Sequence, residues 1–94
     1  MEQTEFKGKV AIVTGAGQGM GRAVADRLAV GGAKLVINDI NPEIAKRTVD
    51  GIACNGGDAY AIAGDVTSSQ DVRGIVEGAL SRYDGVHILV NNAG

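Results

Sequence analysis

Short apolar runs alternate along this chain with longer stretches in which apolar residues recur every three or four positions. The runs predict four strands, at residues 9–14, 34–40, 59–63 and 86–90. The stretches between them predict three helices. Strands and helices that alternate at this spacing form parallel sheets with right-handed crossovers. We therefore expect an α/β domain with a doubly wound sheet in the strand order 3-2-1-4, in three layers but incomplete on one side.

The first two predicted helices have clear boundaries. The first begins near Met20 and stops at Gly31-Gly32. The second takes Asn41 as its N-cap and Pro42 into its first turn, and ends at Asn55-Gly56-Gly57. Apolar positions at helical spacing are Met20, Ala23, Val24 and Leu28 in the first helix, and Ile44, Ala45, Val49 and Ile52, with Thr48, in the second.

The third helix has the most regular amphipathic pattern. The segment Thr67-Ser68-Ser69-Gln70 has the form of a capping box at its start. Its apolar positions are Val72, Ile75, Val76, Ala79, Leu80 and Tyr83. Gly74 and Gly78 are expected on the opposite face, where each costs about 1 kcal/mol relative to alanine.

Length and composition narrow the class of protein. With 94 residues, 45% of them hydrophobic and 21% charged, the chain suits one small globular domain over residues 1–94. A net charge of -2 without a basic cluster makes nucleic acid an unexpected partner. Apolar runs are too short to cross a membrane and the start is acidic, so we expect a cytoplasmic protein. Cys54 is the single cysteine, which excludes an internal disulfide and a cysteine metal cluster.

Small residues are concentrated between the first strand and the first helix, in Thr14-Gly-Ala-Gly-Gln-Gly-Met-Gly21. A glycine loop that leads into a helix exposes backbone N–H groups at the positive end of the helix dipole, which favours a phosphate. The usual Gly-x-Gly-x-x-Gly spacing is absent, and Gly15, Gly19 and Gly21 instead form Gly-x-x-x-Gly-x-Gly. A tight strand-to-helix turn without a ligand is the alternative.

Two aspartates follow the second and third predicted strands. Asp39 closes the second strand, where a carboxylate can accept hydrogen bonds from the ribose hydroxyls of a nucleotide and repel a 2'-phosphate. The alternative is a helix-capping or loop aspartate beside Asn41. Asp65 follows the third strand and fits equally well a loop before a capped helix. The carboxyl ends of parallel strands share one sheet edge, so both aspartates are expected near the glycine loop.

Together with Asn91-Asn92-Ala93-Gly94, these motifs resemble the amino-terminal half of the short-chain dehydrogenase/reductase family. The resemblance runs from about Phe6 to the last residue, and 3-oxoacyl-acyl-carrier-protein reductases and dehydrogenases of small alcohols or steroids look alike over this span. It implies a Rossmann-like fold and hydride transfer between NAD(P)(H) and an alcohol or carbonyl group.

The resemblance also implies a set of cofactor-binding residues. Around the pyrophosphate and ribose these are Gly15, Gly17, Gln18, Gly19, Met20, Gly21, Asp39 and Ile40; near the adenine they are Asp65 and Val66; toward the nicotinamide they are Asn91, Asn92, Ala93 and Gly94. Relatives that prefer NADP usually carry a basic residue at the position of Gln18 or just after that of Asp39. Here those positions hold Gln18 and Ile40, so NAD is the expected cofactor.

The resemblance places the family's catalytic serine and Tyr-x-x-x-Lys motif further along than these residues. Neither tyrosine present fits the motif, because Tyr60 and Tyr83 are followed four positions later by Gly64 and His87. We therefore expect a cofactor-binding half-domain that is not catalytic alone. Ile88 and Val90 are expected on an uncovered fourth strand that pairs with a second copy in a homodimer. A self-associating structural fragment and an S-adenosylmethionine-dependent methyltransferase are the alternative functions.

Overall fold

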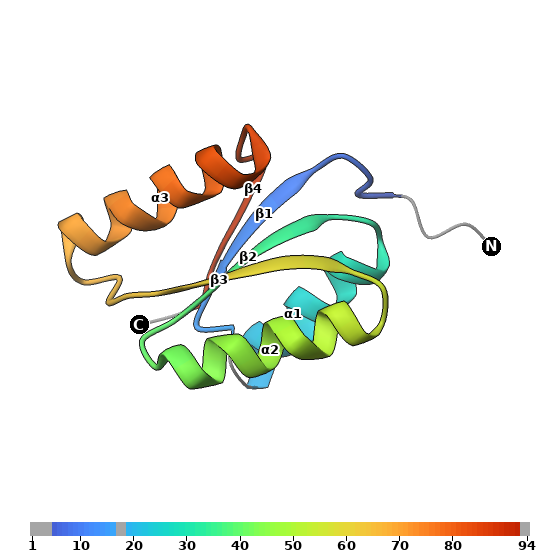
Figure 1. The fold of residues 1–94 in the computed structure, drawn as a ribbon, viewed down its shortest axis with the longest axis horizontal. Helices are drawn as coiled ribbons and strands as arrows, with labels where there is room; N and C mark the ends of the chain where they lie inside the picture. Colours follow the sequence, from blue (N-terminus) through green and yellow to red (C-terminus); the bar gives the residue numbers. More distant parts are fainter. Residues whose placement is uncertain (1–4, 17–18, 93–94) are drawn as a thin grey trace.

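The computed structural model describes residues 5–16 and 19–92. These residues form four strands and three helices (Figure 1). The strands are β1 (Val10–Thr14), β2 (Lys34–Asp39), β3 (Asp58–Ala63) and β4 (Ile88–Asn91), and the helices are α1 (Gly19–Val30), α2 (Pro42–Cys54) and α3 (Ser69–Tyr83). Each boundary lies within about two residues of its expected position, because the glycines and helix caps that set it are local features.

The four strands make one parallel sheet in the order β3-β2-β1-β4, which confirms the predicted topology. Helices α1 and α2 cover one face and α3 covers the other (Figure 1). Thr14 at the end of β1 pairs with Asn38 of β2 and with Asn91 of β4, and Asp39 pairs with Ala63 of β3. The loops that follow all four strands therefore meet at one edge of the sheet.

An apolar cluster lies on each face of the sheet. The larger one joins Ala11, Val13, Leu35 and Ile37 to Ala25, Leu28, Ala45 and Ile52 of α1 and α2. The smaller one joins Ile12 and Val36 to Ile75 and Ala79 of α3. On that second face Val72, Val76, Leu80 and Leu89 remain 38 to 66% exposed, so the layer is incomplete there as expected. Among the described helices, none combines the length and the apolar character needed to span a bilayer.

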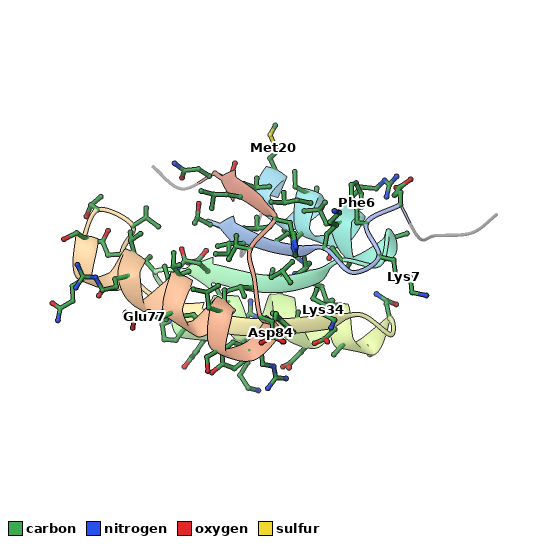
Figure 2. The ribbon with its side chains drawn as sticks, turned by 90° about the horizontal axis from the view of Figure 1, so that it is seen from above. Phe6, Lys7, Met20, Lys34, Glu77 and Asp84 are labelled. Carbon is green, nitrogen blue, oxygen red and sulfur yellow. The ribbon has the colours of Figure 1, made fainter. Side chains whose placement is uncertain are left out.

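Helix α1 docks only in part through the positions expected. Leu28 is buried and Val24 packs against the larger cluster, whereas Met20 and Ala23 are exposed. Met20 is 75% exposed and points away from the sheet (Figure 2). The buried positions of α1 are Gly21, Ala25 and Leu28, of which Gly21 and Ala25 were not expected. The sequence pattern was misleading at Met20 because Gly21, which has no side chain, packs against the backbone of Gly15, and hydrophobicity alone does not mark such a position.

Two expectations for α3 are also wrong. Its N-cap is Ser68, whose hydroxyl accepts from the backbone N–H of Asp71 at 3.3 Å, so the cap lies one residue later than the expected Thr67. Gly78 does not lie on the outer face, because a Cβ there would collide with the Ile62 side chain of β3. Gly78 therefore allows α3 to approach β3 closely, whereas a Cβ at Gly74 would meet nothing within 4 Å.

The uncovered side chain of β4 is Leu89, at 66% exposed, rather than Ile88 or Val90. Ile88 and Val90 are half-buried against the larger cluster on the α1 and α2 face. Leu89 points to the opposite face, as side chains alternate along a strand. It is exposed because the smaller cluster under α3 does not extend over β4.

Tyr83 gives a pH-dependent test of how α3 is docked. Partial burial, with a hydrogen bond from its hydroxyl to Asp58 Oδ1 at 2.7 Å, raises the pKa of Tyr83 to about 12, from an ordinary 10.0. The unfolded chain loses this proton at lower pH than the folded chain, so stability should fall as pH rises from 10 to 12. The Tyr60→Phe variant leaves Tyr83 as the single tyrosine, and its phenolate absorbance should titrate near 12 when folded. An unshifted titration of the folded variant would contradict this docking.

Candidate functional site

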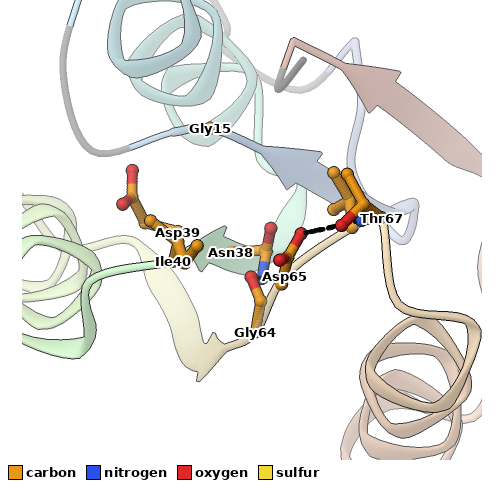
Figure 3. A pocket seen from close by; sticks show the side chains of 8 residues that line it. Gly15, Asn38, Asp39, Ile40, Gly64, Asp65 and Thr67 are labelled. Atoms are coloured by element: carbon orange, nitrogen blue, oxygen red, sulfur yellow. Dashed lines mark hydrogen bonds between the residues drawn. The ribbon is translucent and has the colours of Figure 1, made fainter.

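A pocket of about 290 Å³ opens at the edge where the strands end (Figure 3). Its lining residues come from the end of β2 and from the loops after β1, β2 and β3: Gly15, Asn38, Asp39, Ile40, Gly64, Asp65, Val66 and Thr67. They include two carboxylates and, within the described parts of the chain, neither lysine nor arginine. The pocket therefore offers hydrogen-bond acceptors and negative charge to a ligand.

The glycine loop after β1 has the backbone that its sequence requires. Gly15 and Gly19 have φ of +60° and +62°, in the left-handed region that favours glycine. Gly21, in the first turn of α1, is buried beneath the loop, where a Cβ would collide with the carbonyl oxygen of Gly15. The same Cβ would lie 2.7 Å from Asn92 Nδ2. The absence of a side chain thus brings the helix N-terminus close to the turn.

Ala16 fixes the loop to the rest of the fold. Its backbone N–H donates to the carbonyl oxygen of Asn38 at 3.1 Å. Its own carbonyl accepts from the buried Thr48 hydroxyl of α2 at 3.2 Å. Residues of β2 and α2 therefore hold the start of the loop in place before any ligand arrives, which lowers the entropic cost of binding.

Asp39 ends β2 on one side of the pocket, and Asp65 lies on another (Figure 3). Asp39 Oδ1 accepts from the backbone N–H of Asn41 at 3.0 Å. Asn41 in turn caps α2, since its side chain accepts from the N–H groups of Glu43 and Ile44. Asp39 thus has the local loop role considered as an alternative, and it also lines the pocket. Ile40 beside it is 70% exposed.

Asp65 is held by the turn that precedes α3. Its Oδ1 accepts from the Thr67 hydroxyl at 2.6 Å and from the Thr67 backbone N–H at 2.8 Å. These hydrogen bonds favour the charged form and lower the pKa of the Asp65 carboxyl below its ordinary value. The Asp65 backbone N–H donates to Asp71 Oδ2 at 2.9 Å, so α3 orients the loop. At neutral pH Asp65 presents a fixed carboxylate.

The chain after β4 is tied to the end of β1. The Thr14 hydroxyl lies 3.1 Å from Asn91 Oδ1 and accepts from the Asn92 backbone N–H at 3.1 Å. Asn92 Nδ2 donates to the Gly15 carbonyl at 3.2 Å. Asn92 therefore contacts both the strand end and the glycine turn.

The structure brings together Gly15, Asp39, Ile40, Asp65 and Val66 around the pocket. Other predicted residues lie near it: Gly19 and Gly21 at the start of α1, with Asn91 and Asn92 beside Thr14 and Gly15. The Met20 side chain points to solvent. The predicted Gly17, Gln18, Ala93 and Gly94 lie outside the described residues.

Sequence reasoning missed three lining residues, Asn38, Gly64 and Thr67. A signal for the first was present, because Asn38 directly follows the apolar run Leu35-Val36-Ile37 in a buried strand. A polar side chain at such a position needs hydrogen-bond partners inside the protein. Gly64 and Thr67 had no comparable signal, since glycine and threonine are ordinary loop residues.

A parallel sheet in the order β3-β2-β1-β4, with a glycine loop after β1 and an acidic residue at the end of β2, is the arrangement of the Rossmann class of folds, which typically bind dinucleotides. The family model described as short chain dehydrogenase matches residues 9–94. The chain therefore belongs to the short-chain dehydrogenase family, and the expected resemblance is confirmed. This membership overturns the methyltransferase alternative.

Relatives in this family are similar over nearly all of this chain. The 7alpha-hydroxysteroid dehydrogenase of Escherichia coli (strain K12) is 46% identical over 93 residues, which cover 99% of this chain and 36% of that protein. The cyclohexanol dehydrogenase of Acinetobacter sp. (strain SE19) is 41% identical over 90 residues, which cover 96% of this chain and 36% of that protein. The chain thus spans about a third of the length of these relatives.

Solved structures agree with the fold described above. A crystal structure of a hydroxysteroid dehydrogenase from Escherichia coli superimposes with a TM-score of 0.94 at 43% identity, covering 99% of this chain and 40% of that one. A crystal structure of a short chain dehydrogenase from Mycobacterium smegmatis gives a TM-score of 0.91 at 37% identity, covering 96% of this chain and 38% of that one. The fold and the strand order are those of the family.

Proposed function

We propose that this chain binds NAD at the pocket between the loops after β1, β2 and β3, as the cofactor-binding part of a short-chain oxidoreductase. The observation that carries the proposal is the convergence of Gly15, Asp39 and Asp65 on one pocket. A glycine turn against a helix N-terminus suits a pyrophosphate, and a carboxylate at the end of β2 suits ribose hydroxyls. The family supplies the coarser statement that the cofactor is NAD or NADP.

In this proposal different residues contact different parts of the cofactor. Gly15, Gly19 and Gly21 shape the loop under the pyrophosphate, and Asp39 accepts hydrogen bonds from the adenosine ribose. Asp65 and Val66 meet the adenine, and Asn91 and Asn92 line the path toward the nicotinamide. The roles of Gly17, Gln18, Met20, Ala93 and Gly94 stay predictions from the resemblance. The nicotinamide ring, when bound, supplies or accepts a hydride.

NAD is proposed over NADP on electrostatic grounds. Asp39 and Asp65 put two carboxylates on the pocket, and the exposed residue after Asp39 is the neutral Ile40. A 2'-phosphate beside Asp39 would meet repulsion without a compensating cation among the described lining residues.

The proposed activity of the whole protein is oxidation of an alcohol or reduction of a carbonyl group. The relatives named above are dehydrogenases of a hydroxysteroid and of cyclohexanol, and both substrates are alcohols. The proposal assigns cofactor binding to these 94 residues and no proton-transfer step, since neither tyrosine is followed four positions later by lysine. A cytoplasmic location stays a prediction.

Isothermal titration calorimetry with NAD, NADP and ADP tests the proposal. We expect NAD and ADP to bind and NADP to bind more weakly, because ADP carries the ribose and pyrophosphate that the proposed site contacts. Absence of heat and of a thermal shift at millimolar NAD would instead favour the alternative of a self-associating structural fragment.

We further propose that two copies associate through β4, by antiparallel pairing that extends the sheet. Among the described strands β4 lies at one edge of the sheet, and Leu89 on it is 66% exposed. Exposed apolar edge strands pair readily with other chains. Light scattering at tens of micromolar should report a dimer, and Leu89→Lys should shift it to monomer while Val30→Lys, at an exposed position of α1, leaves it unchanged. A monomeric parent protein under these conditions would refute the pairing.

A further inference from the structure

Asn38 is a buried polar side chain at the pocket that the proposed function leaves without a role. It is 1% exposed and lies at the carboxyl end of β2. Its Nδ2 donates to the carbonyl oxygen of Ile62 at 3.0 Å and to that of Gly64 at 3.3 Å. Both partners can only accept, so the amide nitrogen must face them. The amide oxygen consequently faces the other way, toward the space between Gly15 and Asp65 (Figure 3).

The backbone around Asn38 reaches the loops on both sides. The Asn38 carbonyl accepts from the Ala16 N–H of the glycine loop at 3.1 Å. The Asp39 carbonyl accepts from the Gly64 N–H at 3.2 Å. Gly64 is therefore held through its N–H by the backbone of β2 and through its carbonyl by the Asn38 side chain. The end of β2 thus connects the wall formed by Gly15 to the wall formed by Gly64 and Asp65.

We propose that Asn38 is a positioning residue for the adenine side of the pocket and that its Oδ1 contributes to base selection. Through its hydrogen bond to the Gly64 carbonyl, the Asn38 side-chain amide positions the Gly64–Thr67 segment and therefore the Asp65 carboxylate. Asn38 Oδ1 and the Asp65 carboxylate are both acceptors, so together they favour a purine that carries an amino group over one that carries an oxo group at the same position. This inference rests on the proposed function.

The test replaces Asn38 with leucine, which keeps the approximate size and removes both the donor and the acceptor. We expect the affinity for ADP to fall about tenfold and the preference for NAD over its hypoxanthine analogue to shrink. Ile52→Val serves as the control, because Ile52 is equally buried but lies near the end of α2, away from the pocket. It should lower stability and leave the affinity for ADP unchanged.

Amide hydrogen exchange separates positioning from a merely structural role. In Asn38→Leu we expect amide exchange to rise selectively at Asp65 and Thr67. The Asp65 N–H donates to Asp71 Oδ2 and the Thr67 N–H donates to Asp65 Oδ1, so both report on the position of the Gly64–Thr67 segment. In Ile52→Val any rise should follow the change in global stability. Exchange that rises equally throughout Asn38→Leu, with ADP affinity and base preference as in the parent, would overturn the proposal.

A measurement on the unaltered protein covers the case in which Asn38→Leu does not fold. The two side-chain amide protons of Asn38 should exchange slowly with solvent, and their resonances should shift when ADP is added. Fast exchange, or resonances unmoved at saturating ADP, would also overturn the role of Asn38. If neither NAD nor ADP binds the unaltered protein, the proposed function itself fails. If the unaltered protein and Asn38→Leu bind ADP equally well, only the role of Asn38 fails.

Discussion

Replacing Gly21 with alanine is expected to lower the free energy of unfolding by about 2–3 kcal/mol and to abolish measurable NAD binding. The added Cβ would collide with the Gly15 carbonyl oxygen and would lie 2.7 Å from Asn92 Nδ2. The first of these neighbours is backbone and cannot rotate away, so α1 or the glycine loop must move. Urea denaturation measures the loss of stability, and calorimetric titration measures the loss of binding.

Gly74→Ala is the matched control for this variant. Gly74 lies within α3, and a Cβ there would meet nothing within 4 Å. Alanine is favoured over glycine in a helix, so the control should raise the free energy of unfolding by about 0.5–1 kcal/mol and leave binding intact. Equal effects of the two substitutions would show that close packing at Gly21 does not matter.

Replacing Asp39 with alanine is expected to reduce the preference for NAD over NADP by about ten- to a hundredfold. A hydrogen bond to a charged group contributes about 1.5–3 kcal/mol, which corresponds to roughly a ten- to hundredfold change in affinity. Loss of the carboxylate should therefore weaken NAD binding by about that factor. The same loss removes the repulsion of a 2'-phosphate, so NADP should bind no more weakly than before. Titration of each variant with both cofactors gives the two affinities.

Asp39→Asn distinguishes the charge of Asp39 from its shape, since the amide keeps the size and one acceptor. We expect it to relax the discrimination against NADP while losing less NAD affinity than Asp39→Ala. Glu43→Gln, in the first turn of α2, is the control for removing one negative charge nearby and should leave the preference unchanged. Unaltered affinities for both cofactors in Asp39→Ala would mean that Asp39 does not contact the ribose.

The elements of this fold could be predicted because their signals are local. The apolar run at Leu35–Ile37 marks a strand covered on both faces, and Asn41-Pro42 marks the start of a helix. Alternation of strands and helices then leaves few topologies, and parallel pairing places the ends of all strands at one edge. That Gly15, Asp39 and Asp65 lie close together could be predicted because each follows or ends a strand at that edge.

The faces of the helices were less predictable, because close approach between elements depends on residues far apart in sequence. Gly21 and Gly78 lie at tight contacts, yet glycine has no hydrophobic side chain to mark an inner position. Met20 and Leu80 have such side chains and remain exposed, because neither core cluster includes them. Periodicity reports where apolar groups recur but not how far a neighbouring layer extends.

By itself, the sequence determined the order of elements, the glycine turn and the edge at which polar residues gather, since each depends on residues near one another in the chain. Tertiary structure alone decided that the Asn38 side chain donates hydrogen bonds to the carbonyls of Ile62 and Gly64, and that Gly21 packs against the Gly15 carbonyl. The physical reason is that a hydrogen bond or a steric contact between loops requires the strands to be placed side by side first. Only the folded sheet brings those atoms within reach.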